Sequence, residues 1–345
     1  MFLRLGATAF GGPAAHIAIL RAELVVARGW LSDERFLDLL SAANLIPGPN
    51  STELAIHIGY ERQGWRGLWT AGVCFIAPAA LLCSALAALY TRYGTHPAAA
   101  KILYGMRPVL LAIIVQAIWG LAPKAAPTPK LRVLALLAFV ASLAGVYELA
   151  ILLAAGLAQI TLQRGVFAFV ALGSVPSASL FGVFLKVGSA LFGSGYVLVS
   201  LLRSELVVQR GWLDEPTLLD AIVVGQVTPG PLFTSATFIG YLLRGPTGAL
   251  LATVGIFLPA FVLVAASTPY VSRMRDSVAL SAFLDGVNAA SVALMAAVLV
   301  QTVQSAVVDL PSAALAAVSC VLTITVRMNT SWLVLLGAIV GLTLH

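Results

Sequence analysis

Long apolar stretches dominate this sequence and constrain its fold more than any other feature. Residues 67–91, for example, contain no Asp, Glu, Lys or Arg. Of the 345 residues, 60% are hydrophobic and 10% are charged, whereas about 25% are charged in soluble domains. So few charges cannot cover a soluble protein of this size, which excludes cytosolic enzymes, secreted domains and disordered chains. Because the apolar residues form continuous blocks, not alternating strands, we expect an all-α polytopic membrane protein.

The chain is internally duplicated. Residues 2–31 align with residues 184–213, and the pattern RxELVVxRGWL occurs in both segments. Further along, each half carries the motif Pro-Gly-Pro, at 47–49 and at 229–231. A repeat of this length is too long for a solenoid unit and matches half of a transporter. We therefore expect a first repeat over 1–165, a linker over 166–181 and a second repeat over 182–345.

Each half contains six apolar blocks, and helix-breaking motifs interrupt the first two. The first block contains FGGP in one half and FGSG in the other, and the second block contains Pro-Gly-Pro in both. Two prolines spaced two apart cannot continue a helix. Broken backbone is tolerated at membrane depth only where protein or water surrounds it. We expect broken helices at these motifs, with block two a re-entrant hairpin; a single proline-kinked span is the alternative.

Positive charges flank block two on both sides, which is typical of cytoplasmic loops. Arg21, Arg28 and Arg35 precede the block, and Arg62 and Arg66 follow it. The block should therefore return to its own side, so each half crosses an odd number of times and the second repeat is inverted. This gives about ten crossings plus two hairpins, or about 12 or 13 spans if block two crosses. The net charge of +6 then indicates orientation, not nucleic-acid binding.

The motifs together resemble the chromate ion transporter family in its long, two-domain form. The resemblance rests on FGGP near the start, RxELVVxRGWL in both halves and Pro-Gly-Pro in both second blocks, and it covers nearly the whole chain. It implies a multi-pass inner-membrane antiporter that exports chromate in exchange for protons and confers chromate resistance, with a homodimer as one option. Sulfate is the natural look-alike of chromate. FGSG departs from FGGP, so we expect the two halves to contribute unequally.

The breaks also suit an oxyanion site between the repeats. Half-helix N-termini supply free N–H groups and the positive end of the helix dipole, and glycine allows close backbone approach. A basic residue six positions before the first break of each half could neutralise a dianion or simply lie at the membrane interface. The expected substrate-binding residues are Arg4, Gly11, Gly12, Pro13, Asn44, Pro47, Gly48, Pro49, Asn50, Ser51 and Thr52 in the first half, and Lys186, Gly193, Ser194, Gly195, Gln226, Pro229, Gly230, Pro231 and Thr234 in the second.

A second group of residues is a candidate for proton coupling or gating. Glu53 is the only acidic residue within a few positions of either Pro-Gly-Pro; it could carry a proton or form a capping box with Asn50. Two further charged pairs recur in both halves, and a structural ion network is the alternative role for them. His16 has no histidine counterpart in the second half and suits packing or hydrogen bonding. The recurrent charged residues are Arg21 and Glu23, with Arg203 and Glu205.

Other classes of protein fit the sequence less well. A passive anion channel would use the same helix-terminus donors, and only kinetics separates it from a transporter. Another transporter of sulfate or a similar oxyanion fits equally. For an intramembrane serine protease, Ser194 would have only the terminal His345 as a base within its half. The sequence contains no P-loop, no HExxH and no cluster of metal ligands, so we expect no enzyme activity, no cofactor and no metal.

Overall fold

The computed structural model of this protein is built from helices. It describes residues 1–10, 12–94, 96–164, 179–191, 197–270, 277–326, 328 and 330–344, and no strand occurs among them. Within these residues, four helical segments are long and apolar enough to cross a membrane, and several shorter apolar helices accompany them. The predicted all-helical, multi-pass membrane fold is therefore confirmed, whereas the number of crossings stays a prediction. The four long segments are Ser51–Tyr93, Pro97–Ala125, Leu232–Ser267 and Val278–Ala306.

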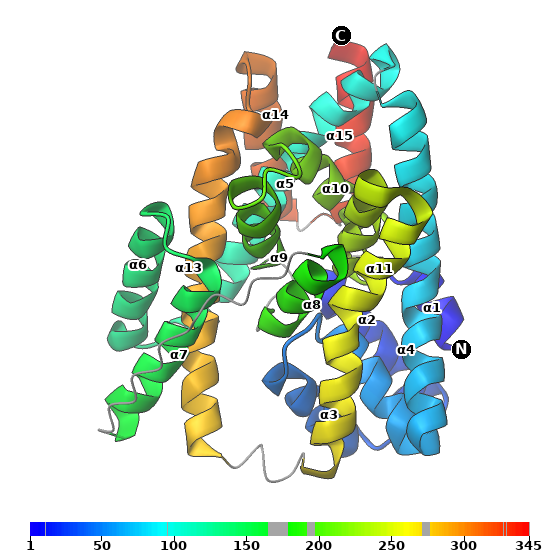
Figure 1. The fold of residues 1–345 in the computed structure, drawn as a ribbon, viewed down its shortest axis with the longest axis vertical. Helices are drawn as coiled ribbons and strands as arrows, with labels where there is room; N and C mark the ends of the chain where they lie inside the picture. The colour runs from blue at the N-terminus through cyan, green and yellow to red at the C-terminus, as the bar shows by residue number, and fades with distance from the viewer. Residues whose placement is uncertain are drawn as a thin grey trace.

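The two halves contain corresponding elements in the same order (Figure 1). The first half consists of α1 (Phe2–Thr8), α2 (Gly12–Arg21), η1 (Ala22–Ala27), α3 (Asp33–Leu45), α4 (Ser51–Tyr93), α5 (Pro97–Ala125), α6 (Pro129–Leu143) and α7 (Glu148–Arg164). The second half consists of α8 (Leu180–Ala190), α9 (Val197–Leu202), η2 (Arg203–Val208), α10 (Glu215–Val227), η3 (Leu232–Thr234), α11 (Ser235–Ser267), η4 (Thr268–Tyr270), α13 (Val278–Ala306), α14 (Leu310–Val321), η5 (Leu322–Val326) and α15 (Thr330–Leu344).

The duplicated sequence produces duplicated local structure. In both halves the motif RxELVV forms a π-helix, η1 or η2. The glycine of the following RGW ends it, with φ of +58° at Gly29 and +59° at Gly211, a conformation that glycine adopts without strain. The next helix is then capped at equivalent positions, by the side chains of Ser32 and Asp214. The same sequence therefore forms the same π-helix, glycine turn and side-chain cap in the two repeats.

Each Pro-Gly-Pro motif separates two helices that fold back on one another. In the first half, Arg35 at the start of α3 and Glu61, near the end of the same block, form an ion pair with 2.9 Å between Nε and Oε1. In the second half, Gly225 of α10 packs against the side chain of Ser235 at the start of α11. Because the ends of the first-half block meet, the block is a hairpin and not a single kinked span.

A second reversal lies inside α4 and inside α11. Gly64 has a φ of +56° and Gly245 a φ of +61°, and both interrupt otherwise helical backbone. The backbones of Gly59 and Gly67 touch across this reversal, and the equivalent glycines of α11 do the same. Each element is thus a short arm folded against a long helix. The long parts of α4 and α11 run in opposite directions (Figure 1).

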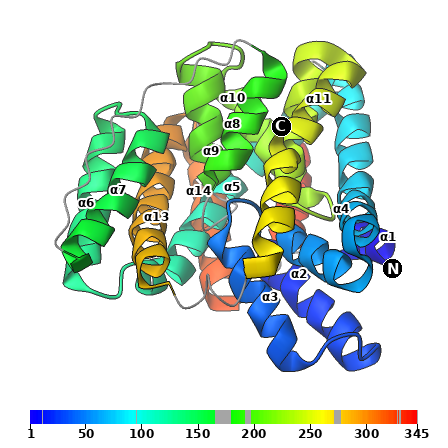
Figure 2. The same ribbon diagram turned by 60° about the horizontal axis from the view of Figure 1, so that its bottom comes forward.

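The two halves interlock through their later helices. The fourth block of each half, α5 or α13, packs against the last helix of the other half, α15 or α7. Gly105 of α5 lies against Gly337 and Gly341 of α15, and Gly286 of α13 lies against Ala155 of α7. Small residues allow such close approach between membrane helices. Figure 2 shows α6 and α7 of the first half beside α13 of the second.

Candidate functional site

The breaks of the two halves meet at the centre of the molecule. The backbone amide of Gly48 donates to the carbonyl of Leu191 at 2.7 Å, and the amide of Gly230 donates to the carbonyl of Ala9 at 2.9 Å. Ala9 and Leu191 hold equivalent positions at the ends of α1 and α8, so the two bonds are reciprocal. We call this region, formed by the two Pro-Gly-Pro loops with the ends of α1 and α8, the central crossing.

The reciprocal bonds change the role of two expected donors. The amides of Gly48 and Gly230 already have carbonyl partners in the other half, so they join the repeats and are not free for an anion. Close helix packing brings α1 and α8 to the central crossing. Gly6 of α1 lies against the carbonyl of Phe75, and Gly188 of α8 lies against the carbonyl of Ile256. Glycine at these positions lets α1 and α8 reach the crossing.

Helix starts converge on the central crossing. α4 begins at Ser51, one residue beyond the first Pro-Gly-Pro, and η3 leads into α11 directly after the second. α2 begins at Gly12, three residues after the carbonyl that accepts from Gly230. The first turns of a helix carry unpaired N–H groups and partial positive charge. Gly11 and the segment Gly193–Gly195, with Ser194, were also expected here and lie outside the described residues.

The first-half side of the crossing is polar. His16 is buried, its Nδ1 lies 3.2 Å from the hydroxyl of Ser51 and its Nε2 lies 3.0 Å from the carbonyl of Ala9. That carbonyl also accepts from Gly230, so His16 reaches the contact between the repeats. Since a carbonyl can only accept, Nε2 carries a proton. The hydroxyl of Ser51 lies 3.1 Å from the carbonyl of Pro49 and donates to it, so its single hydrogen is shared between that carbonyl and Nδ1 of His16. The hydrogen-bonding role expected for His16 is present.

Glu53 is buried beside the first Pro-Gly-Pro. Its side chain has no exposed surface, and it lies so close to Gly48 that a Cβ there would overlap the carboxylate. Apart from the backbone amide of Glu53 itself, neither carboxylate oxygen has a hydrogen-bond partner among the described residues. Asn50 makes no side-chain cap on α4, so the capping-box interpretation is wrong. The buried hydroxyl of Thr52 likewise has no partner in the described chain.

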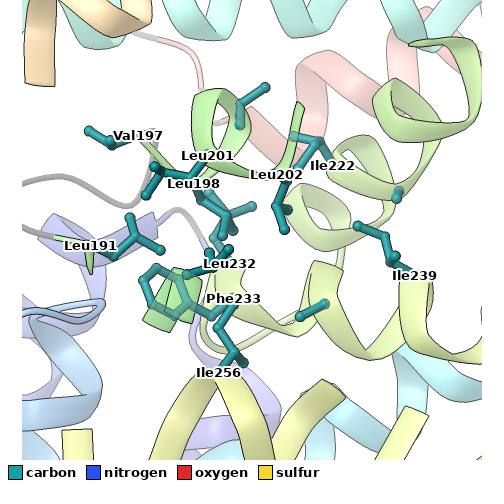
Figure 3. Close-up of a cluster of buried hydrophobic side chains, with 14 of the residues drawn as sticks. Leu191, Val197, Leu198, Leu201, Leu202, Ile222, Leu232, Phe233, Ile239 and Ile256 are labelled. Atoms are coloured by element: carbon teal, nitrogen blue, oxygen red, sulfur yellow. The ribbon is translucent and has the colours of Figure 1, made fainter. Parts of the chain in front are cut away.

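The second-half side of the crossing is largely apolar, and its buried polar groups in the described chain are hydroxyls, such as that of Thr234. Leu198 replaces His16 in the repeat alignment, and Figure 3 shows Leu191, Leu198, Leu232 and Phe233 in one cluster of buried hydrophobic side chains. Thr234 is buried, but its hydroxyl is held by the carbonyl of Pro231 at 2.8 Å. The ionisable groups at the described part of the crossing therefore come from the first repeat alone, consistent with unequal contributions of the halves.

The recurrent charges form an ion network in each half. Glu23 pairs with Arg4 and with Arg28, both at 2.9 Å. At equivalent positions of the second half, Glu205 pairs with Lys186 at 2.8 Å and with Arg210, and the hydroxyl of Tyr147 donates to it. A further pair links each π-helix region to the next helix: Arg21 with Asp33 and Arg203 with Glu215. The partners of Arg4 and Lys186 in this structure are carboxylates, and their contact with an anion stays a prediction.

The remaining residues expected at the site differ in their burial. Pro47, Pro49 and the second Pro-Gly-Pro are buried at the crossing, Asn44 is exposed, and the half-buried Gln226 has an amide nitrogen without a partner among the described residues. A buried ion pair between Arg107 and Asp220 was not predicted from the sequence. Its only signal was that Arg107 aligns with an asparagine in the second half. No group of His, Cys, Asp and Glu within the described chain is arranged to hold a metal ion.

These features define a class of protein. Two interlocked helical repeats whose broken helices meet at the centre are the architecture of a multi-pass membrane transporter. The central crossing supplies helix starts, buried hydroxyls and one buried carboxyl group. The chain belongs to the chromate transporter family: the family model matches residues 1–160 and 178–342, one segment for each half.

Curated relatives agree with this assignment. A chromate transport protein from Cupriavidus metallidurans is 32% identical, over 99% of this chain and 91% of the relative. A chromate transport protein from Pseudomonas aeruginosa is 33% identical, over 90% and 82%. A probable chromate transport protein from Synechococcus elongatus is 29% identical, over 90% and 85%. No solved structure matches the chain.

Proposed function

We propose that this protein is a secondary transporter of tetrahedral oxyanions in the inner membrane, and that it exports chromate by proton antiport and so confers chromate resistance. The observation that carries the proposal is the reciprocal bonding at the central crossing, Gly48 to Leu191 and Gly230 to Ala9. It supports a single site shared by two repeats, at the point where broken backbone is enclosed by protein. Chromate is the substrate named for the curated relatives.

The donors for the anion, in this proposal, are the first turns of the helices that start at the crossing. The amides of Gly48 and Gly230 bond between the repeats, and those of Ser51 and Thr234 bond to nearby carbonyls. The binding groups are therefore the remaining first-turn amides of α4 and η3, such as that of Thr52, together with the hydroxyl of Thr52. A dianion in a low-dielectric site needs several such donors. Sulfate carries the same charge and shape, so it should compete with chromate.

Glu53 is the proposed proton carrier. It is the buried carboxyl group at the crossing without a partner from another residue of the described chain, and such a group changes its charge readily when its surroundings change. Antiport requires that the proton and the anion be bound in alternate steps of the cycle. Export of chromate would then be driven by proton entry.

The position of Glu53 also favours a second candidate, symport of a proton with the anion. A carboxylate next to an anion site repels the anion, and its protonation removes that repulsion and adds a donor. The proton and the anion would then bind together and move in the same direction. The two candidates use the same residues and differ in the sign of the coupling.

Flux into proteoliposomes tests both candidates. Chromate uptake is measured with an acidic exterior, with an acidic interior and with no pH gradient, and sulfate is added as competitor. Antiport predicts that an acidic interior drives uptake, because protons leave as chromate enters, and symport predicts that an acidic exterior drives it. Flux independent of the gradient, without acceleration by chromate on the opposite side, would identify a passive channel and contradict the proposal.

A further inference from the structure

A buried ion pair joins the two repeats away from the central crossing. The guanidinium of Arg107 in α5 binds both carboxylate oxygens of Asp220 in α10, with Nε–Oδ1 at 2.7 Å and Nη2–Oδ2 at 2.8 Å. The hydroxyl of Tyr90, at the end of α4, donates to Oδ2 at 2.9 Å. Asp220 is fully buried and Arg107 is 27% exposed. This bidentate pair therefore fixes the hairpin helix of the second repeat to the first repeat.

The repeat alignment shows only half of this pair on the opposite side. Asp38 of α3 is the counterpart of Asp220, whereas Asn288 of α13 stands where the first half has Arg107. Asp38 is only half-buried, and its charge acts on Arg35 of its own helix. Each hairpin thus carries an acid at the same position, but of the two aligned positions on α5 and α13 only Arg107 is basic.

The two hairpins also differ in their packing. α10 packs against α5, α13 and α15, whereas α3 packs chiefly against α4. Figure 1 shows the same contrast, with α3 at the lower edge of the molecule and α10 among α5, α11 and α15. Leu37 of α3 is 56% exposed, and its counterpart Leu219 of α10 is fully buried. One sequence pattern therefore occupies two packing states within the same molecule. α10 is docked against α5, α13 and α15, whereas the buried face of α3, with Phe36 and Leu39, packs within the first half. We call the first state docked and the second undocked.

We propose that the Arg107–Asp220 pair is a latch for the docked state of α10, and that transport exchanges the states of the two hairpins. In the exchanged state α3 docks against α13, which brings Asp38 toward Asn288, and α10 leaves α5. The proposal rests on the transport function proposed above. The internal repeat makes the state with α10 docked and the state with α3 docked similar in energy. Only the first contains the Arg107–Asp220 pair, so Arg107 determines which state the transporter occupies without substrate.

Chemical labelling in the absence of substrate tests the latch. In full-length protein without its native cysteines, Leu219→Cys and Leu37→Cys are introduced separately, and their reaction rates with N-ethylmaleimide are measured in proteoliposomes. We expect Leu219→Cys to react slowly, and roughly tenfold faster once Arg107→Gln is added, since loss of the pair populates the undocked state. Lys101→Gln removes a charge from the same helix and should leave the rate unchanged.

A reciprocal variant separates a latch from a merely structural ion pair. Asn288→Arg supplies the missing arginine on the opposite side, so it should slow the labelling of Leu37→Cys and speed that of Leu219→Cys. The charge exchange Arg107→Asp with Asp220→Arg should restore protection of Leu219→Cys. Faster labelling at both positions in Arg107→Gln would indicate general loosening and overturn the proposal, as would an unchanged rate at Leu219→Cys. Because no anion is present, this result is independent of whether chromate is the substrate.

Discussion

The glycines of the two Pro-Gly-Pro motifs are fixed by backbone conformation and by space. Gly48 has a φ of +148° and Gly230 a φ of +92°. A Cβ on Gly48 would overlap the carboxylate of Glu53, and one on Gly230 would lie 2.8 Å from the Cβ of Ala79. We expect Gly48→Ala and Gly230→Ala each to destabilise the protein by about 1–3 kcal/mol and to weaken chromate binding, while the chain remains inserted.

Thermal unfolding and direct binding to the purified variants measure these two effects. Gly120→Ala is the matched control, because Gly120 is helical and a Cβ there meets nothing within 4 Å. Its midpoint should stay the same or rise slightly, since alanine favours helix. If both Pro-Gly-Pro variants keep the wild-type midpoint and affinity, these loops do not shape the site.

Glu53 provides the test of proton coupling. Glu53→Gln keeps the shape of the side chain but cannot lose a proton, so we expect anion binding to persist while the response of chromate flux to an imposed pH gradient disappears. Thr52→Val, one residue earlier, removes a buried hydroxyl without touching the carboxyl group, and it should weaken binding while leaving the coupling intact. Full gradient dependence in the Gln variant would remove Glu53 from the mechanism.

The residues of the crossing show what a sequence can and cannot reveal at this scale. Pro-Gly-Pro marks the breaks because proline cannot continue a helix, and the duplication identifies Ala9 and Leu191 as equivalent positions. It does not show that the amide of Gly48 would find its partner in the other repeat. Likewise, Arg4 and Glu23 are separated by a helix break, so their ion pair depends on how α1 packs.

At the scale of elements, the same ion network is built in two environments. Glu205 is 1% exposed and bound by Lys186 and Arg210, whereas Glu23 is 19% exposed and its partners Arg4 and Arg28 are largely in contact with solvent or lipid. Removing the carboxylate leaves buried positive charge in the second half only. We expect Glu205→Gln to destabilise the protein by about 3 kcal/mol and Glu23→Gln by less than about 1 kcal/mol.

Chemical denaturation in detergent, followed by helical circular dichroism, gives both values. The same denaturation at high salt distinguishes the two ion networks further, because salt screens an exposed ion pair and has much less effect on a buried one. Equal losses of stability in the two variants would mean that the second network is not buried in the membrane-embedded protein.

Local sequence explains where the elements begin and end better than it explains which elements pack together. Caps at Ser32 and Asp214 and the reversals at Gly64 and Gly245 follow from local chemistry that the repeat shows twice. The packing of each half against the last helix of the other half, α5 with α15 and α13 with α7, does not follow from local chemistry. It depends on small residues such as Gly105 and Gly286 lying on the correct face, and apolar helices offer many faces of nearly equal hydrophobicity.

At the scale of the whole molecule, interlocking makes the two repeats one unit. α5 and α13 each pack against the last helix of the other half, and the crossing bonds tie the halves again at the centre. A half chain would expose the glycine faces of α5 or α13 and leave the amide of Gly48 or Gly230 without its partner. The conformational change proposed for the hairpins therefore takes place on a scaffold that both repeats build.

The orientation of the repeats in the membrane gives the last prediction. The long parts of α4 and α11 run in opposite directions (Figure 1), and the loop charges differ in the same sense: Arg62 and Arg66 lie at the reversal of the first half, whereas Arg244 is the one basic residue at that of the second. By the positive-inside rule the first reversal faces the cytoplasm and the second faces the periplasm. Replacement of Cys74, Cys83 and Cys320 leaves a background in which single introduced cysteines report the side.

A membrane-impermeant maleimide should therefore label Gln63→Cys only in inside-out vesicles and Leu243→Cys only in right-side-out vesicles. Pro127→Cys lies in the loop between α5 and α6, which Lys124 and Lys130 flank. It should be labelled from the same side as Gln63→Cys and serves as the cytoplasmic control. Labelling of Gln63→Cys and Leu243→Cys from the same side would contradict the inverted repeat. The exchange of hairpin states would then lose its physical basis, because two repeats of the same orientation cannot open a shared site to opposite sides by exchanging conformations.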